Sequence, residues 1–215
     1  MKSKPNVSVL YAPGTNCEVE TMEALRLAGG EPRLVFLRDL LTGKEEITGC
    51  DCFVVPGGFS YGDYPETGVA VAEFLAAHLP KLVAWGIPTL GICNGMQILV
   101  RAGLFGPGLA MDSNDCGAFV SRPIIHRVEL SHCLWTKGLE GGIFTFPAAH
   151  GYGKLVGPNV QNVNVVMTYQ GDSPSGGRIA AICDEWGGVM AMMDHLERRP
   201  DNEAGQMILR NVLSA

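Results

Sequence analysis

One cysteine lies between two glycines in the stretch TLGICNGMQIL, residues 89–99. The apolar residues before Cys93 predict a strand and the residues after it predict a helix, which places Cys93 on the turn between the two. A side chain on such a turn projects above the end of a sheet, and the flanking Gly91 and Gly95 allow neighbouring chain to come close. The amino terminus of the following helix also stabilises a thiolate. The pattern predicts a nucleophilic cysteine, and its alternative is a buried cysteine in a tight turn.

Backbone N–H groups near this cysteine could bind the negative oxygen that forms when a thiolate attacks a carbonyl. The N–H of Asn94, directly after Cys93, would face that oxygen. A second N–H would come from Gly58 in the stretch PGGFSYGD, residues 56–63, which follows a predicted strand. Two such donors would form an oxyanion hole. A phosphate-binding loop is the alternative for this stretch, but no Gly-Lys-Ser/Thr follows it.

A candidate base lies in the stretch DHLER, residues 194–198, directly after an apolar run. In an extended segment, His195 and Glu197 point to the same side, so the carboxylate could orient the imidazole beside Cys93. The alternative is a solvated charged turn. His150 in the stretch FPAAHGYG is a rival base or a wall of the site, but no carboxylate is paired with it. The other three histidines lack such a context and are expected to be structural or exposed: His78, His126 and His132.

Short apolar runs alternate with helical patterns in the first half of the chain. The predicted strands there are residues 7–12, 34–37, 52–55 and 89–92. The predicted helices are one that follows a capping-box pattern at residues 15–18 and runs to about 28, and two at 69–85 and 94–102. This alternation predicts a doubly wound, mostly parallel sheet with helices on both faces, and sites at the carboxyl ends of its strands.

The second half of the chain has a different pattern. Its predicted strands are residues 127–130, 143–146, 163–169, 178–182 and 189–193, and a closing helix is predicted at 203–213. Glycine-rich turns between these strands favour a smaller antiparallel or mixed sheet packed on the first half. With no linker or repeat in the sequence, we expect residues 1–215 to form a single α/β domain.

Composition excludes several classes of protein. The net charge of −6, without a run of Lys or Arg, argues against a nucleic-acid partner. Seven cysteines without a Cys-x-x-Cys predict neither a zinc site nor a disulfide framework, and Cys50, Cys52 and Cys183 are expected to pack as small hydrophobic residues. No apolar stretch is long enough for a membrane span, so the cytoplasm is the expected location.

These residues together resemble a known family. The stretch GICNGMQIL at residues 91–99 and the downstream His195-x-Glu197 resemble the class I, or triad, glutamine amidotransferases, which have a flavodoxin-like sheet. The stretches PGTNC at residues 13–17, PGGFSYGDY at 56–64 and HGYG at 150–153 narrow the resemblance to the glutaminase subunits of phosphoribosylformylglycinamidine synthase. The resemblance extends from about residue 6 to 214.

The resemblance implies a mechanism and a set of partners. Cys93 would attack the side-chain amide of L-glutamine, His195 would pass a proton to the leaving ammonia, and Glu197 would orient His195. Gly58 and Asn94 would form the oxyanion hole, and contacts with glutamine are expected from Gly57, Phe59, Gln97 and His150. Ammonia would pass to a synthetase subunit, assembled with a small bridging subunit. ATP and Mg would bind that synthetase, so no cofactor or metal is expected on this chain.

Departures from the family pattern leave the acceptor and partner open, and one of them is Ser173-Pro-Ser-Gly-Gly177 in place of an Asn-Gly-Ser before Arg178. The family has Pro-His-Pro-Glu where this chain has Asp194 and Leu196 around His195, and an ionised Asp194 beside the base would favour imidazolium. The family also has Leu-Arg where this chain has Pro65-Glu66. The alternatives are a paralogous glutaminase that serves another synthetase, a catalytically weak scaffold subunit, and a protease-like or deglycase-like protein with a cysteine on a similar turn.

Overall fold

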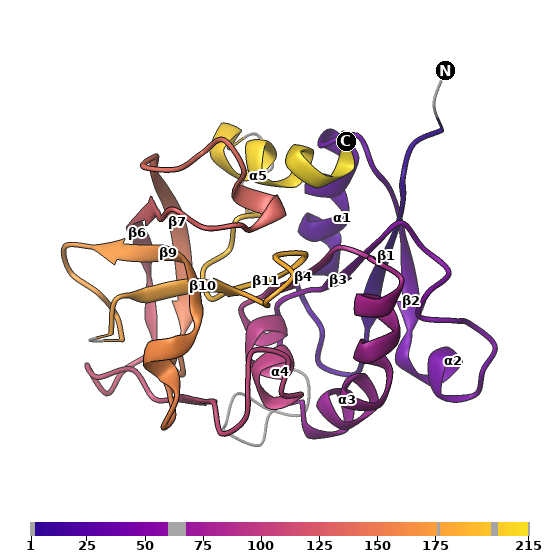
Figure 1. The fold of residues 1–215 in the computed structure, drawn as a ribbon, viewed down its shortest axis with the longest axis horizontal. Helices are drawn as coiled ribbons and strands as arrows, with labels where there is room; N and C mark the ends of the chain where they lie inside the picture. The colour runs from indigo at the N-terminus through magenta and orange to yellow at the C-terminus, as the bar shows by residue number, and fades with distance from the viewer. Residues whose placement is uncertain (1–2, 60–67, 176, 199–201, 215) are drawn as a thin grey trace.

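Five parallel strands form one half of the main sheet. The computed structural model describes residues 3–59, 68–175, 177–198 and 202–214 (Figure 1). In this part of the chain the parallel strands run in the spatial order β2-β1-β3-β4-β11. Their bounds are β1 Asn6–Tyr11, β2 Glu31–Phe36, β3 Cys52–Val55, β4 Thr89–Ile92 and β11 Val189–Met192. This is the flavodoxin-like order, whose crevice lies between β1 and β3 at the carboxyl edge.

Four antiparallel strands continue the same sheet beyond β11. They follow in the order β10-β9-β6-β7, so the described strands form one nine-stranded sheet. Their bounds are β10 Ile179–Cys183, β9 Asn164–Gln170, β6 Val120–Val128 and β7 Ile143–His150. A separate antiparallel pair consists of β5, Ala110–Asp112, and β8, Lys154–Val156. A mostly parallel sheet and a small antiparallel sheet are both present, but the small sheet is the β5–β8 pair, whereas the strands predicted in the second half of the chain continue the main sheet.

Helices cover both faces of the parallel half. Their bounds are α1 Glu18–Leu27, α2 Leu37–Leu41, α3 Val69–Ala84, α4 Asn94–Arg101 and α5 Glu203–Leu213, with short 3₁₀ helices at η1 Leu134–Thr136 and η2 Val160–Asn162. Figure 1 shows α1 and α5 together on one side of the sheet, and α3 and α4 on the other. Among the described residues, no helix combines the length and the apolar character that a membrane crossing needs.

Complete burial of three central strands explains their unbroken apolar runs. Every residue of β3, β4 and β11 is buried, because helices lie above and below them. The sequence therefore predicted these strands almost to the residue. It missed the short elements α2, β5 and β8, and it placed the start of β6 seven residues late, at 127 instead of Val120.

The start of α1 differs from the predicted capping box. The N-cap residue is Cys17, which makes no side-chain capping bond. The hydroxyl of Thr15 instead accepts a hydrogen bond from the N–H of Ala12 at 3.1 Å. Thr15 therefore stabilises the turn at the end of β1. The N-cap position of α1 is occupied by Cys17 instead.

Candidate active site

Cys93 lies on a strained turn between β4 and α4. Its φ of 53° and ψ of −109° make it the one non-glycine residue with positive φ in the described part of the chain. Such backbone conformations cost about 1–3 kcal/mol and persist where the surroundings impose them, most often at functional sites. The N–H of Cys93 donates to the carbonyl of Met192 at the end of β11, 2.8 Å away. The predicted position of Cys93 at a strand-to-helix turn is observed.

Close packing explains the glycine on the helical side of this turn. A Cβ atom at Gly95 would collide with the carbonyl oxygen of Val55, which is backbone at the end of β3 and cannot move aside. A Cβ atom at Gly91 would lie 2.6 Å from the Leu99 side chain and 2.8 Å from the Gly95 carbonyl oxygen. The α4 helix is therefore packed directly on β3, and this contact fixes the direction of the turn.

Gly95→Ala is expected to destabilise the fold by about 1–3 kcal/mol, because the added methyl group must push α4 away from β3. Urea denaturation of the purified variant would measure this loss. Gly177→Ala is the matched control, since its nearest described neighbour would lie 3.9 Å from the new Cβ and its φ is not positive. Equal stability of the two variants would contradict the packing argument.

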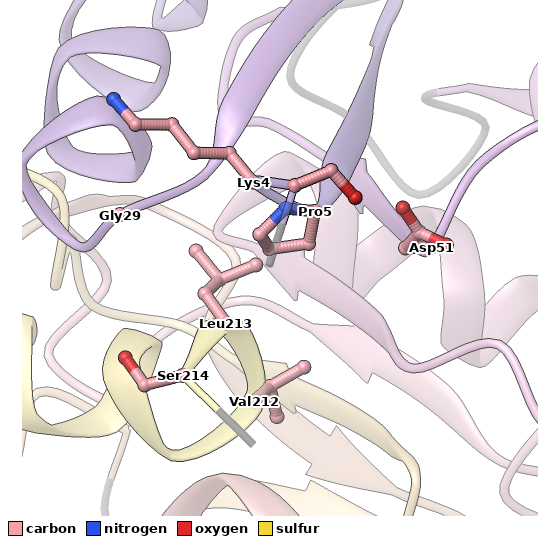
Figure 2. A pocket seen from close by; sticks show the side chains of 8 residues that line it. Lys4, Pro5, Gly29, Asp51, Val212, Leu213 and Ser214 are labelled. Carbon is pink, nitrogen blue, oxygen red and sulfur yellow. The ribbon is translucent and has the colours of Figure 1, made fainter. Parts of the chain in front are cut away.

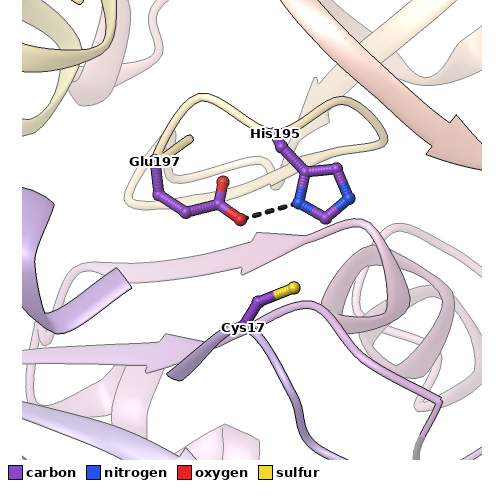
Figure 3. A group of neighbouring side chains, drawn as sticks. All are labelled: Cys17, His195 and Glu197. Carbon is purple, nitrogen blue, oxygen red and sulfur yellow. Dashed lines mark hydrogen bonds and ion pairs between the residues drawn. The ribbon is translucent and has the colours of Figure 1, made fainter. Parts of the chain in front are cut away.

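His195 and Glu197 form a buried pair just beyond β11. Nδ1 of His195 lies 2.7 Å from Oε1 of Glu197, and both side chains are 1% exposed (Figure 3). The N–H of His195 donates to the carbonyl of Pro147 at 2.9 Å, which ties this segment to β7. The predicted pairing of imidazole and carboxylate is therefore observed, with the intervening Leu196 buried as well.

The electrostatics of this pair favour a protonated imidazole. Burial alone would lower the pKa of His195, but the negative charge of Glu197 outweighs it, with further raising contributions from the thiols of Cys17 and Cys93. The pKa of His195 is therefore raised well above its ordinary value. Nε2 of His195 is buried and has no hydrogen-bond partner among the described residues. This nitrogen can serve a reacting group near Cys93.

Glu197→Gln is expected to reduce stability in a pH-dependent way. A raised pKa of His195 in the folded state stabilises the fold fully below the unfolded-state pKa of about 6.5, and this contribution is lost as the pH rises through the folded-state value. Thermal or urea unfolding should therefore show a wild-type advantage of about 2 kcal/mol near pH 6 that shrinks above it. Glu23→Gln, on the exposed face of α1, is the control. A difference that grows with pH would contradict this assignment.

A second cysteine, Cys17, lies against the His195–Glu197 pair and was not predicted there. Its thiol donates to Oδ1 of Asn16 at 3.2 Å and accepts from Nη2 of Arg198 at 3.7 Å. Figure 3 shows its sulfur directed toward the His195 ring. The sequence feature that could have predicted this position is that Cys17 follows β1, because the carboxyl ends of β1 and β3 border the crevice of this fold.

Gly57 packs closely against both Cys17 and His195. A Cβ atom at Gly57 would lie 2.9 Å from Cε1 of His195 and 3.0 Å from the sulfur of Cys17. The carbonyl of Gly57 accepts the N–H of Cys17 at 3.3 Å, and no peptide bond in the described chain is cis. The N–H of Gly58 therefore points to the opposite side of that peptide, away from the α1 terminus. This peptide is the one that was expected to supply half of the oxyanion hole.

Asn94 and Gln97 form a short chain of hydrogen bonds on the first turn of α4. Nδ2 of Asn94 donates to Oε1 of Gln97 at 2.8 Å, and Nε2 of Gln97 donates to the carbonyl of Tyr152 at 2.9 Å. The Gln97 side chain is thereby fixed beside Cys93, with both ends of its amide engaged. The roles of the Asn94 N–H and of Gln97 toward glutamine remain predictions.

Asp194 faces away from His195, contrary to the expectation that its charge would act on this base. Its Oδ2 lies 2.6 Å from Nε2 of His126, and its Oδ1 lies 3.2 Å from Nε2 of His150. Burial alone would raise the pKa of the Asp194 carboxyl, but hydrogen bonds and positive charge from the two histidines hold it below its ordinary value. His126 was expected to be structural, which agrees with its complete burial.

Two other predicted contact residues lie at different depths. His150 is 1% exposed, and its Nδ1 and Nε2 contact Asn114 and Asp194, so a contact between its ring and glutamine remains a prediction. Phe59 is 45% exposed, and its N–H donates to the carbonyl of Gly14 at 2.7 Å. The rest of the PGGFSYGDY stretch, with the departure at Pro65 and Glu66, lies outside the described residues.

One group of described side chains has ligand atoms close enough for a metal ion. One atom from each of Cys17, His195 and Glu197 lies within 4.8 Å of the others, and all three residues are buried. The imidazole and the carboxylate of this group are already bonded to each other. The proximity of His195 and Glu197 is therefore explained by their hydrogen bond as an acid–base pair, without a metal ion.

A pocket of about 510 Å³ lies at the opposite edge of the sheet. Figure 2 shows its lining by Lys4 and Pro5 before β1, Asp51 before β3, and Leu213 and Ser214 at the end of α5. These positions precede the strands, whereas Cys93 and His195 follow them. The pocket is therefore separate from the candidate active site.

The arrangement can carry out acyl transfer through a thiol. A strained cysteine at a helix amino terminus, beside an imidazole that a carboxylate orients, is the arrangement typical of a cysteine-nucleophile enzyme, here on a flavodoxin-like sheet. The chain belongs to the CobB/CobQ-like glutamine amidotransferase domain family, whose model matches residues 4–211.

Relatives with a more specific description match over nearly the whole chain. The phosphoribosylformylglycinamidine synthase subunit PurQ of Thermotoga maritima is 36% identical and covers 98% of each chain. The corresponding subunit of Frankia casuarinae is 38% identical over 94% of this chain and 88% of its own. The resemblance that the sequence motifs indicated is therefore confirmed.

Solved structures support the fold. A chain in the structure of PurLQS from Thermotoga maritima superposes with a TM-score of 0.85 at 33% identity, covering 99% of both chains. The glutaminase domain of CTPS from Trypanosoma brucei, solved with bound acivicin, has a TM-score of 0.68 at 13% identity over 97% of this chain and 93% of its own. The second likeness concerns the fold alone.

Proposed function

We propose that this chain is the glutaminase subunit of phosphoribosylformylglycinamidine synthase in purine biosynthesis, with residues 1–215 acting as one amidotransferase domain. It hydrolyses L-glutamine to glutamate and ammonia, and it passes the ammonia to a synthetase subunit that makes formylglycinamidine ribonucleotide. The observation that carries this proposal is the strained Cys93 beside the buried His195–Glu197 pair, in a chain similar from end to end to PurQ subunits.

The thiol of Cys93 carries the covalent step. Its thiolate attacks the side-chain carbonyl carbon of glutamine, a C–S bond forms, and the C–N bond breaks as His195 gives a proton to the leaving ammonia. Water then attacks the glutamyl thioester, His195 accepts its proton, and glutamate leaves with the thiol restored. The raised pKa of His195 supports its role as the proton donor in the first half of this cycle.

Backbone N–H groups of Gly58 and Asn94 stabilise the oxyanion in both steps. The bond from Cys17 N–H to the Gly57 carbonyl supports this proposal, because it fixes the orientation of the peptide that carries the Gly58 N–H. Gly57, Phe59 and Gln97 contact the substrate, and the fixed amide of Gln97 is well suited to hold a polar group of glutamine. His150 is the fourth residue that we expect to contact the substrate.

The acceptor chemistry takes place on partner subunits. We place ATP and Mg on the synthetase, and we expect a small bridging subunit to complete the assembly, so this chain needs no cofactor of its own. The orientation of Asp194 argues against a crippled scaffold subunit, because its charge is directed to His126 and His150 and leaves the triad intact.

Glutamate release from glutamine tests this function. The chain should be measured alone, and then with a purine-pathway synthetase, its bridging subunit, ATP and formylglycinamide ribonucleotide. Release that rises when the partners and acceptor are added supports the proposal. Release that ignores them assigns the glutaminase to another synthetase, and no release in either condition contradicts the proposed activity.

A further inference from the structure

A buried polar cluster lies directly behind the catalytic histidine. This Asp194 cluster consists of Asp194, His126, His150 and Asn114, and each of these residues is at most 2% exposed. Asp194 follows β11, His126 belongs to β6, His150 ends β7, and Asn114 lies between β5 and β6. Buried polar groups at this depth are costly unless their hydrogen bonds are satisfied, so the partners of each atom indicate its protonation.

The Nδ1 atoms of both histidines must carry hydrogen. Nδ1 of His126 lies 3.0 Å from the carbonyl oxygen of Ile124, which can only accept. Nδ1 of His150 lies 3.1 Å from Oδ1 of Asn114. That oxygen is identified by its surroundings, because Nδ2 of Asn114 donates to the carbonyls of Ala118 and His150 while Oδ1 accepts the N–H of Gly153.

The carboxylate of Asp194 is therefore the hydrogen-bond partner of Nε2 in both His126 and His150. With Nδ1 protonated, a neutral imidazole presents only a lone pair at Nε2, which repels a carboxylate oxygen. The 2.6 Å contact between Nε2 of His126 and Oδ2 of Asp194 therefore requires a proton between the two atoms. An asparagine in this place could donate to one Nε2, but its oxygen would face the other.

The cluster is continuous with both sides of the active site. On one side, Asp194 directly precedes His195 in the chain, and the His195 N–H is held by Pro147 on β7. On the other side, Asn114 binds the N–H of Gly153, and the adjacent Tyr152 carbonyl holds Gln97 beside Cys93. The Asp194 cluster is thus linked to His195 through the chain, and to Gln97 beside Cys93 through the Tyr152–Gly153 segment.

We propose that Asp194 is a positioning residue for the glutaminase reaction, which holds His195 in register with Cys93 by pairing its buried carboxylate with His126 and His150. It touches neither substrate nor reacting atoms. The inference rests on the proposed glutaminase function, but one readout below, alkylation of Cys93, needs no glutamine. The two proposals can therefore fail separately.

Asp194→Asn in the full chain is the primary test. Because misplacement of a catalytic group by about 1 Å can cost a hundredfold in rate, we expect kcat for glutamine hydrolysis to fall about 10- to 100-fold. KM should stay within about twofold, since no residue expected to contact the substrate is substituted. The pH midpoint of Cys93 alkylation by iodoacetamide should rise by at least about half a unit, because a displaced imidazolium stabilises the thiolate less.

The titratable groups around this cluster define what else could move that midpoint. Tyr169 packs against His126 with ring centroids 5.2 Å apart, and its pKa is raised by burial and by the charges of Asp194 and Cys93. Further titratable groups beside the cluster are His195, which is paired with Glu197, and Cys93. The alkylation profile should therefore be recorded in Tyr169→Phe as well, where the midpoint is expected to stay close to wild type.

Asp184→Asn is the matched control for general destabilisation. Its carboxylate is also buried, but it accepts the N–H of Val189 at 3.0 Å at the opposite end of β11. This variant is expected to lose stability without a change in kcat or in the alkylation midpoint. If kcat and the alkylation midpoint changed in both Asp194→Asn and Asp184→Asn in proportion to the stability each variant loses, the positioning role would be contradicted.

His126 provides a second test that does not depend on the folding of Asp194→Asn. The amide nitrogen of His126→Gln can still donate to Asp194, whereas His126→Leu cannot donate at all. We expect His126→Gln to keep kcat within about threefold of wild type and His126→Leu to lose about tenfold or more. Equal activity of these two variants, or a folded Asp194→Asn with wild-type kcat and alkylation midpoint, would overturn the proposal.

Discussion

Cys93→Ala is expected to lower kcat for glutamine hydrolysis by at least about a thousandfold, to the background rate, because it removes the proposed nucleophile. Alanine keeps the Cβ atom on the strained turn, so relaxation of the backbone does not contribute to the loss. The side chain is small and packed at the end of a strand, and its removal should change the free energy of unfolding by about 1 kcal/mol or less. Glutamate release and urea denaturation would measure the two quantities.

Cys17→Ser is the matched control for this result. Cys17 also has a buried thiol near His195, but it lies on the α1 side of the ring and has its own partners in Asn16 and Arg198. Its serine variant should retain glutaminase activity within about tenfold of wild type. If Cys17→Ser lost activity while Cys93→Ala retained it, our assignment of the nucleophile to Cys93 would be wrong.

His195→Asn is expected to lower kcat by about a thousandfold or more, since it removes the group that moves protons in both halves of the reaction. KM for glutamine should change little, because the imidazole contributes to proton transfer and not to substrate binding. The substitution also leaves the Glu197 carboxylate buried without its imidazole, so unfolding should occur at lower temperature.

Alkylation of Cys93 separates this chemical effect from the stability effect. Without the imidazolium, the thiolate loses a neighbouring positive charge, and its alkylation at neutral pH should slow by about tenfold. His195→Asn combined with Glu197→Gln removes the unpaired carboxylate and should recover stability while kcat stays low. Recovery of kcat in that double variant would contradict the role of His195.

The sequence predicted the turn at Cys93 and the pairing of His195 with Glu197 because both depend on short local patterns. Gly91-x-Cys93-x-Gly95 requires a close approach between α4 and β3, and the collision at Gly95 shows that this requirement is real. The His195-x-Glu197 pair needs only an extended backbone to place both side chains together. The strands β3, β4 and β11 were predicted because complete burial leaves an unbroken apolar run.

The direction of Asp194 could not be predicted from the sequence. Its partners lie 68 and 44 residues away in the chain, on β6 and β7, and their approach depends on how the antiparallel half of the sheet continues from β11. Local reasoning paired Asp194 with its neighbour His195, although adjacent residues in an extended segment point to opposite sides. The same dependence on long-range packing concealed Cys17, whose place beside His195 is set by the β1–β3 crevice.

The most direct test of the central claim is to map which thiol a substrate-like electrophile modifies. A glutamine analogue with an electrophilic carbon in place of the side-chain amide would be incubated with wild type, Cys93→Ala and Cys17→Ser. Intact mass and peptide analysis would then locate the adduct. Our account predicts a single adduct on Cys93, which is absent in Cys93→Ala and retained in Cys17→Ser. An adduct on Cys17, or one that persists in Cys93→Ala, would contradict Cys93 as the nucleophile.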